Sequence, residues 1–85
     1  MIAIHRKDGT LQAIPTHAVR MVEYLPSLGV IRVHYLTERP LYIEVKVGEK
    51  EARGYLLDFA SGVVVDIHEE YEKHVNGHGG IYIED

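Results

Sequence analysis

The stretch GVIRVHYLTERPLYIEVKV, residues 29–47, decides the fold because apolar and polar side chains alternate along it on both sides of a loop. This period of two is typical of β-strands that bury one face. A loop of residues 36–40 keeps the two faces separate, whereas a shorter loop would set apolar side chains opposite polar ones. The resulting pairs are Tyr35 with Leu41, Val33 with Ile43 and Ile31 with Val45 on one face, and Arg32 with Glu44 and His34 with Tyr42 on the other. Both sets are favourable cross-strand partners, so the stretch predicts an antiparallel hairpin.

A second hairpin is predicted over residues 2–14, where IAIHRK and LQAI flank the pair Asp8-Gly9. An Asp-Gly pair between apolar runs is the signal for a two-residue type I′ turn. Such a turn sets four apolar side chains on one face, which are Ile2, Ile4, Leu11 and Ala13.

The segment PTHAVRMVEYL, residues 15–25, fits both a helical stripe and an alternating strand. We favour a strand that follows a short turn, because strands are predicted on both sides of it and Pro26 ends it.

Residues 49–61 change to a helical period, with apolar side chains at Ala52, Tyr55, Leu56, Phe59 and Ala60. Gly62 suits a helix end, while Gly54 weakens the helix by roughly 1 kcal/mol relative to alanine. We expect Tyr55, Leu56 and Phe59 to pack on the apolar face of the 29–47 hairpin.

The remainder of the chain predicts three short elements. Val63, Val65 and Ile67 alternate as in a strand, and residues 67–75 resemble a short helix that Asp66 and Glu69 would cap. Residues 81–85 form a brief terminal strand. The predicted class is therefore α+β, a single domain over residues 1–85, with a mainly antiparallel meander of four to six strands and one or two short helices in the C-terminal half.

Composition restricts how such a small chain can be stabilised. Apolar residues make up 46% of its 85 residues and cysteine is absent, which excludes disulfides and thiolate zinc sites. A domain of this size buries only about 60 to 65% of its unfolded surface. Self-association is the remaining way to bury more, so we expect a homodimer in which the terminal strand 81–85 adds to a sheet edge.

The charge is concentrated at the C-terminal end. The net charge is −4, and residues 66–85 carry Lys73 against six carboxylates. Phosphate backbones are repelled by such a segment, and no basic stripe lies elsewhere, so nucleic acid is not expected as a partner. No apolar run approaches the ~20 residues of a membrane span, and MIAIHRKDGT is charged too soon for a signal peptide. We expect a cytoplasmic protein without membrane contact.

The stretch HEEYEKHVNGHGG, residues 68–80, raises the question of a metal site. In a helix, His68 and His74 would lie about 120° apart around the axis and could not share one ion. In an extended segment, His68, Glu70, Glu72 and His74 would lie on one side. The simpler interpretation is a solvated acidic helix, so no metal and no cofactor are predicted, and His68, His74 and His78 are the metal candidates.

No motif points to catalysis. The serines lie in no nucleophile motif and the glycine turns precede no phosphate-binding helix, so no catalytic residue is predicted. Three strand tyrosines, Tyr24, Tyr42 and Tyr82, suggest contact with another protein, because tyrosine is enriched at interfaces. We predict a non-catalytic protein–protein interaction module, an adaptor or regulator. The alternative is a small-molecule or metal-binding protein, or an enzyme with its site at a subunit interface.

Residues 1–47 resemble the small flagellar accessory proteins of the FlbD/SwrD type. The likeness lies in the opening Met-Ile, an Arg before an Asp-Gly turn, an apolar segment that reaches Glu23, and a final hairpin. The rest of the chain departs from that pattern, and no function is transferred from it.

Overall fold

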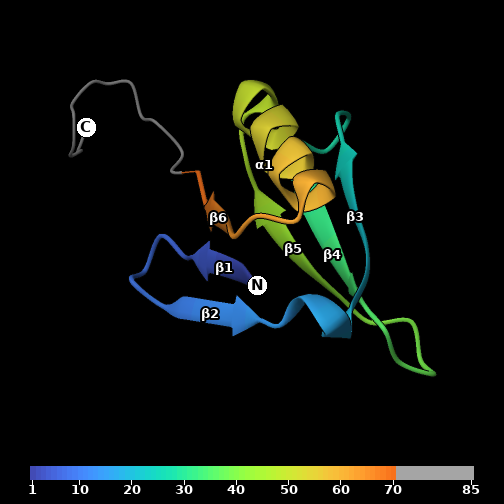
Figure 1. Ribbon diagram of the computed structural model, residues 1–85. Helices are drawn as coiled ribbons and strands as arrows, with labels where there is room; N and C mark the ends of the chain where they lie inside the picture. Colours follow the sequence, from blue (N-terminus) through green and yellow to red (C-terminus); the bar gives the residue numbers. More distant parts are fainter. Residues whose placement is uncertain (71–85) are drawn as a thin grey trace, which may run out of the picture.

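The computed structural model describes residues 1–70, which form two three-stranded sheets and one helix (Figure 1). The elements in chain order are β1 (Ile2–His5), β2 (Leu11–Ile14), the 3₁₀ turn η1 (Thr16–Ala18), β3 (Val19–Leu25), β4 (Val30–Tyr35), β5 (Tyr42–Lys46), α1 (Glu49–Ser61) and β6 (Val65–His68). The mixed sheet has the order β2-β1-β6 and the antiparallel sheet has the order β3-β4-β5. The α+β class is confirmed, but the strands form two sheets and not one meander.

The hairpin of β4 and β5 has the register that the sequence predicts. Ile31 lies opposite Val45 and Val33 lies opposite Ile43. At the loop end of the hairpin, the N–H of Tyr35 donates to the carbonyl of Leu41 at 2.9 Å. These contacts bury one face and leave the opposite face polar.

The hairpin of β1 and β2 forms, but its register differs from the predicted one by one residue. Ile2 lies opposite Ile14, and the N–H of Arg6 donates to the carbonyl of Thr10 at 2.8 Å. The loop has three residues, 7–9, because Gly9 adopts a φ of 94° and closes a turn of a different type. The shift moves Leu11 and Ala13 to the outer face and Ile14 into the core, so the predicted apolar face was wrong for β2.

Asp8 fixes the conformation of this loop. Its Oδ1 accepts the N–H of Thr10 at 2.9 Å. That hydrogen bond stabilises the carboxylate and lowers the pKa of Asp8 below its ordinary value.

The ambiguous segment is a strand after a short turn, as we favoured. Its pairing with β4 is irregular between Val19 and Met21, which marks a β-bulge, and regular from Met21 to Leu25.

Helix α1 covers one face of the antiparallel sheet and lies against β3 and β6 (Figure 1). It spans the predicted residues and ends at Gly62, which has a φ of 79°. Ala52 is fully buried, and Tyr55 and Phe59 pack half-buried against the core as expected. Leu56 is half-buried as well.

The segment after the helix corrects two expectations. Val65–His68 is a strand that pairs parallel with β1, whereas a meander would have required an antiparallel neighbour. The predicted helix of residues 67–75 was wrong at its start, because burial of Val65 and Ile67 against β1 requires extended backbone. Val63 precedes the strand and is exposed. The rest of that helix and the terminal strand 81–85 lie outside the described residues.

One core joins the two sheets and the helix. Its buried members are Ile2, Ile4, Ile14, Ile31, Val33, Val45, Val47, Ala52, Val65 and Ile67. No helix within residues 1–70 has the length and apolar character needed to cross a membrane.

Polar contacts connect the sheets at one end. Arg6 of the mixed sheet's hairpin donates through Nη1 to the carbonyl of Glu44 on β5 at 3.1 Å. Just beyond β6, the N–H of Glu70 donates to the carbonyl of Lys46 at 2.8 Å. The edges of β5 and β6 are thereby held together.

Candidate functional site

The outer face of the antiparallel sheet, opposite the helix, carries a connected set of polar and aromatic side chains. We call this set the tyrosine face and define it by Glu23, Arg32, His34, Tyr42 and Glu44. These residues reach one surface because alternate side chains of β3, β4 and β5 point away from the core.

An ion pair and a histidine–carboxylate hydrogen bond flank Tyr42. Arg32 Nε donates to Glu44 Oε1 at 3.0 Å, and His34 Nε2 bonds Glu23 Oε2 at 2.7 Å. Both pairs join neighbouring strands, so each fixes the side chain on β4 that lies next to the tyrosine.

The ring of Tyr42 contacts both of these fixed side chains. The guanidinium carbon of Arg32 lies 4.7 Å from the ring centroid, a cation–π arrangement. The imidazole of His34 lies 5.4 Å from it at a tilt of 50°. Tyr42 is nevertheless 45% exposed, so a large aromatic surface is held in one orientation and remains accessible.

The tyrosine face has side chains that are common in protein-binding surfaces. Tyrosine and arginine are the residues in which interface hot spots are enriched. Each acidic side chain of the face is bonded to a neighbour, Glu44 to Arg32 and Glu23 to His34. Met21, 38% exposed, lies opposite His34 and extends the face with an apolar border.

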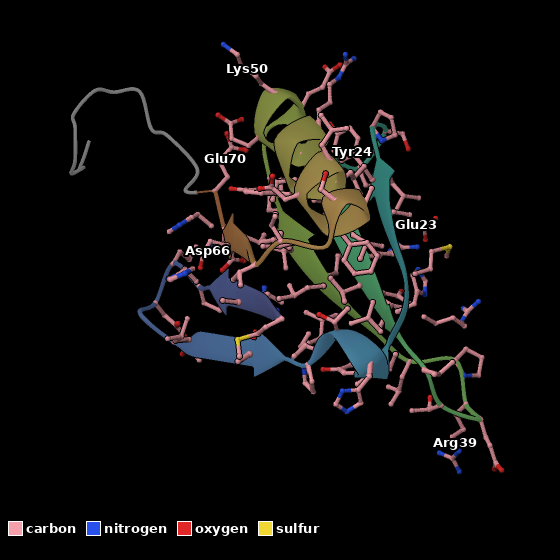
Figure 2. The ribbon with its side chains drawn as sticks, viewed as in Figure 1. Glu23, Tyr24, Arg39, Lys50, Asp66 and Glu70 are labelled. Carbon is pink, nitrogen blue, oxygen red and sulfur yellow. The ribbon has the colours of Figure 1, made fainter. Side chains whose placement is uncertain are left out.

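The three predicted contact tyrosines have different positions. Tyr42 is on the tyrosine face as described. Tyr24 is half-buried against the core and lies on the α1 side of β3, whereas Glu23 lies on the other side (Figure 2). Tyr82 lies outside the described residues.

The metal candidates are not assembled within the part of the chain that the structure describes. His68 stacks on His5 of β1, with ring centroids 4.2 Å apart and planes within 11°. His5 Nε2 is bonded to Asp66 Oδ1 at 3.1 Å, so this nitrogen is directed at a carboxylate. No group of three or more ligand side chains among residues 1–70 could hold a metal ion. His74 and His78 lie outside those residues.

A shallow hollow lies beside Arg6 at the loop of the first hairpin. It measures about 350 Å³ and is lined by Arg6, Lys7, Asp8, Thr10, Gln12 and Glu69. Arg6 is already bound there, through Nε to Gln12 Oε1 at 2.8 Å and through Nη1 to Glu69 Oε2 at 3.4 Å. Ligand pockets are mostly enclosed, whereas this hollow is open to solvent.

Sequence reasoning missed the role of Glu23 in the tyrosine face. The hairpin register predicted the neighbours Arg32, Glu44, His34 and Tyr42, because a short loop ties their strands together. Glu23 comes from β3, whose pairing includes a bulge that no sequence signal located.

Comparison with known proteins adds no family to this geometry. No family model matches the chain, and no curated protein or solved structure matches it either. The likeness of residues 1–47 to the flagellar accessory proteins therefore stays a resemblance of sequence.

Proposed function

We propose that this protein is a small non-catalytic interaction module of the cytoplasm, an adaptor or regulator, and that it binds another protein through the tyrosine face. The observation that carries the proposal is the fixed, exposed ring of Tyr42 between Arg32 and His34. A side chain that is already held in its binding orientation loses little entropy when a partner covers it.

The surrounding charges support specificity. Glu23 and Glu44 hold His34 and Arg32 in place and surround the ring with a polar rim. An aromatic centre with a polar rim is the anatomy of protein interfaces. The shallow hollow beside Arg6 offers no comparable support for a small-molecule site.

Site-specific photocrosslinking in an extract of the source cells tests the proposal. A photoreactive lysine analogue replaces Lys46, which is on the same sheet face as Glu44, and in a matched protein it replaces Lys50 on α1. Both lysines are exposed, so a partner can reach the probe at either position. We expect a discrete crosslinked partner from position 46 and none from position 50.

Substitutions on the tyrosine face complete the test. Tyr42→Ala and Arg32→Ala, each added to the position 46 probe, should remove most of the crosslink while the fold remains intact by circular dichroism. Leu57→Ala, on the exposed surface of α1, should leave it unchanged. Equal crosslinking from both lysines, or a crosslink that Tyr42→Ala does not affect, would exclude the tyrosine face.

A further inference from the structure

Within residues 1–70 the two sheets have four edge strands, which are β2, β6, β3 and β5. Among them, β3 is the one whose outer edge is open to another strand. At β6, the N–H of His68 donates to the hydroxyl of Tyr55 at 3.2 Å, and the N–H of Glu70 is bound as well. At β5, the carbonyl of Glu44 accepts a hydrogen bond from Arg6 Nη1, and the carbonyl of Lys46 accepts one from the N–H of Glu70. The edge strand β2 has four residues and is followed by Pro15, both of which limit pairing.

By contrast, β3 is seven residues long, and no other described element lies beyond it (Figure 1). The bulge at its start confines regular pairing to the rest of the strand. An exposed strand of this length is a template for addition of another strand.

The hydrogen-bond pattern identifies the free backbone groups of β3. The bonds Tyr35 N–H to Leu41 O at 2.9 Å and Val47 N–H to Gly29 O at 3.0 Å show that the odd residues of β4 bond to β5. Its even residues, Arg32 and His34 among them, therefore bond to β3. They lie opposite Glu23 and Met21, so the backbone groups of Val22 and Tyr24 point away from the sheet.

We propose that a second copy of this chain pairs antiparallel with β3, about a twofold axis that passes through Val22. In this register Val22 lies opposite Val22 of the second copy, and Met21 lies opposite Glu23 of the second copy. Both Val22 residues then exchange the backbone hydrogen bonds that face outward.

Charge and bonding exclude two other registers, and an axis through Met21 would set Val22 opposite Arg20, which lies in the bulge. An axis through Glu23 sets the two Glu23 carboxylates directly opposite each other, which is destabilising. An axis through Tyr24 sets Val22 opposite Pro26 of the second copy, and proline has no N–H to donate. The axis through Val22 avoids these conflicts, so the edge is complementary to itself.

Such a dimer has a defined shape. A twofold axis perpendicular to the sheet joins the two antiparallel sheets into one of six strands and sets both tyrosine faces on the same side. The pairing depends on β3 alone and stands whether or not the tyrosine face binds a partner.

Sedimentation and amide exchange test the dimer directly. The mass of the intact chain is measured by sedimentation from about 1 μM to 1 mM, because edge pairing buries a small interface and is expected to be weak. Over the same range, hydrogen exchange by NMR should slow at the amide of Val22, the residue on the axis. The amides of Met21 and Glu23, which bond to β4 in the monomer, are the internal control.

Paired charge substitutions test the register. Met21→Glu sets two like-charge contacts across the axis and should weaken the dimer roughly 2- to 30-fold, whereas Met21→Lys sets two opposite-charge contacts and should strengthen it by a similar factor. Leu57→Glu and Leu57→Lys place the same charges on the exposed surface of α1, outside the β3 edge, and should leave the dissociation constant unchanged.

The outcomes separate this proposal from the proposed function. A monomer at 1 mM overturns the dimer. A dimer with an unprotected Val22 amide, or with equal response to both Met21 substitutions, overturns this interface. Tyr42→Ala should leave dimerisation intact, so loss of partner binding and loss of the dimer are read independently.

Discussion

Tyr55 contributes to two parts of the structure through one side chain. Its ring packs half-buried against the core, while its hydroxyl accepts the N–H of His68 at 3.2 Å. The bond closes part of the β6 edge with a side chain from the helix. An edge N–H without such a partner would be left to solvent.

We therefore expect Tyr55→Phe to lower the free energy of unfolding by about 0.5 to 1.5 kcal/mol, the net contribution of one hydrogen bond. The measurements are urea unfolding and hydrogen exchange of the His68 amide, which should become faster. Tyr42→Phe is the matched control, because the Tyr42 hydroxyl has no hydrogen-bond partner within residues 1–70. Unchanged exchange at His68 would show that the hydroxyl does not protect this edge.

Two glycines should respond in opposite directions to alanine. Gly54 is inside α1, and an added Cβ there would meet nothing within 4 Å, so Gly54→Ala should stabilise the protein by about 1 kcal/mol. Gly62 has a φ of 79°, a conformation that costs a residue with a Cβ about 1 to 2 kcal/mol. Thermal unfolding of both variants checks this difference, and two shifts of the same sign would contradict it.

At the scale of the element, the turn between β1 and β2 decides which side chains the hairpin buries. Ile14 is 3% exposed and Leu11 is 63% exposed, the reverse of what a two-residue turn implies. Ile14→Ala should lower the free energy of unfolding by about 2 to 5 kcal/mol. Leu11→Ala should change it by less than about 0.5 kcal/mol. A larger loss at Leu11 in urea unfolding would support the two-residue turn instead.

The elements that could be predicted are those defined by local pattern. The five-residue loop of the β4–β5 hairpin and the bounds of α1 followed from apolar spacing. The hairpin register in turn placed four residues of the tyrosine face, which are Arg32, His34, Tyr42 and Glu44. The β1–β2 register could not be predicted, because it depends on the φ of Gly9 and on the Asp8 side chain. The pairing of β1 with β6 could not be predicted either, since no periodicity relates strands so distant in sequence.

At the scale of the whole molecule, both sheets and the helix depend on the same core. Val33 of the antiparallel sheet and Ile4 of the mixed sheet belong to one buried cluster. The two sheets should therefore unfold together, as small domains with a single core do.

Val33→Ala tests this expectation. The loss of two methyl groups from a fully buried position should cost about 1.5 to 3 kcal/mol. The unfolding of each strand is followed in urea through its NMR amide signals. The midpoint urea concentration should fall by the same amount for β1 and β6 as for β4 and β5. Separate midpoints for the two sheets would show that each folds alone.

The parallel pairing of β1 with β6 has a consequence for the protein during its synthesis. Ile2 finds its neighbour Val65 only after 63 further residues have been made. At roughly 5 to 20 residues per second, translation needs about 3 to 13 s for that distance. During this interval the edge of β1 that β6 will occupy is unpaired, while the later hairpin and helix can already assemble from local contacts. Within the described fold, the first hairpin is then the part most exposed to aggregation and to chaperones, and the synthesis of β6 ends that period.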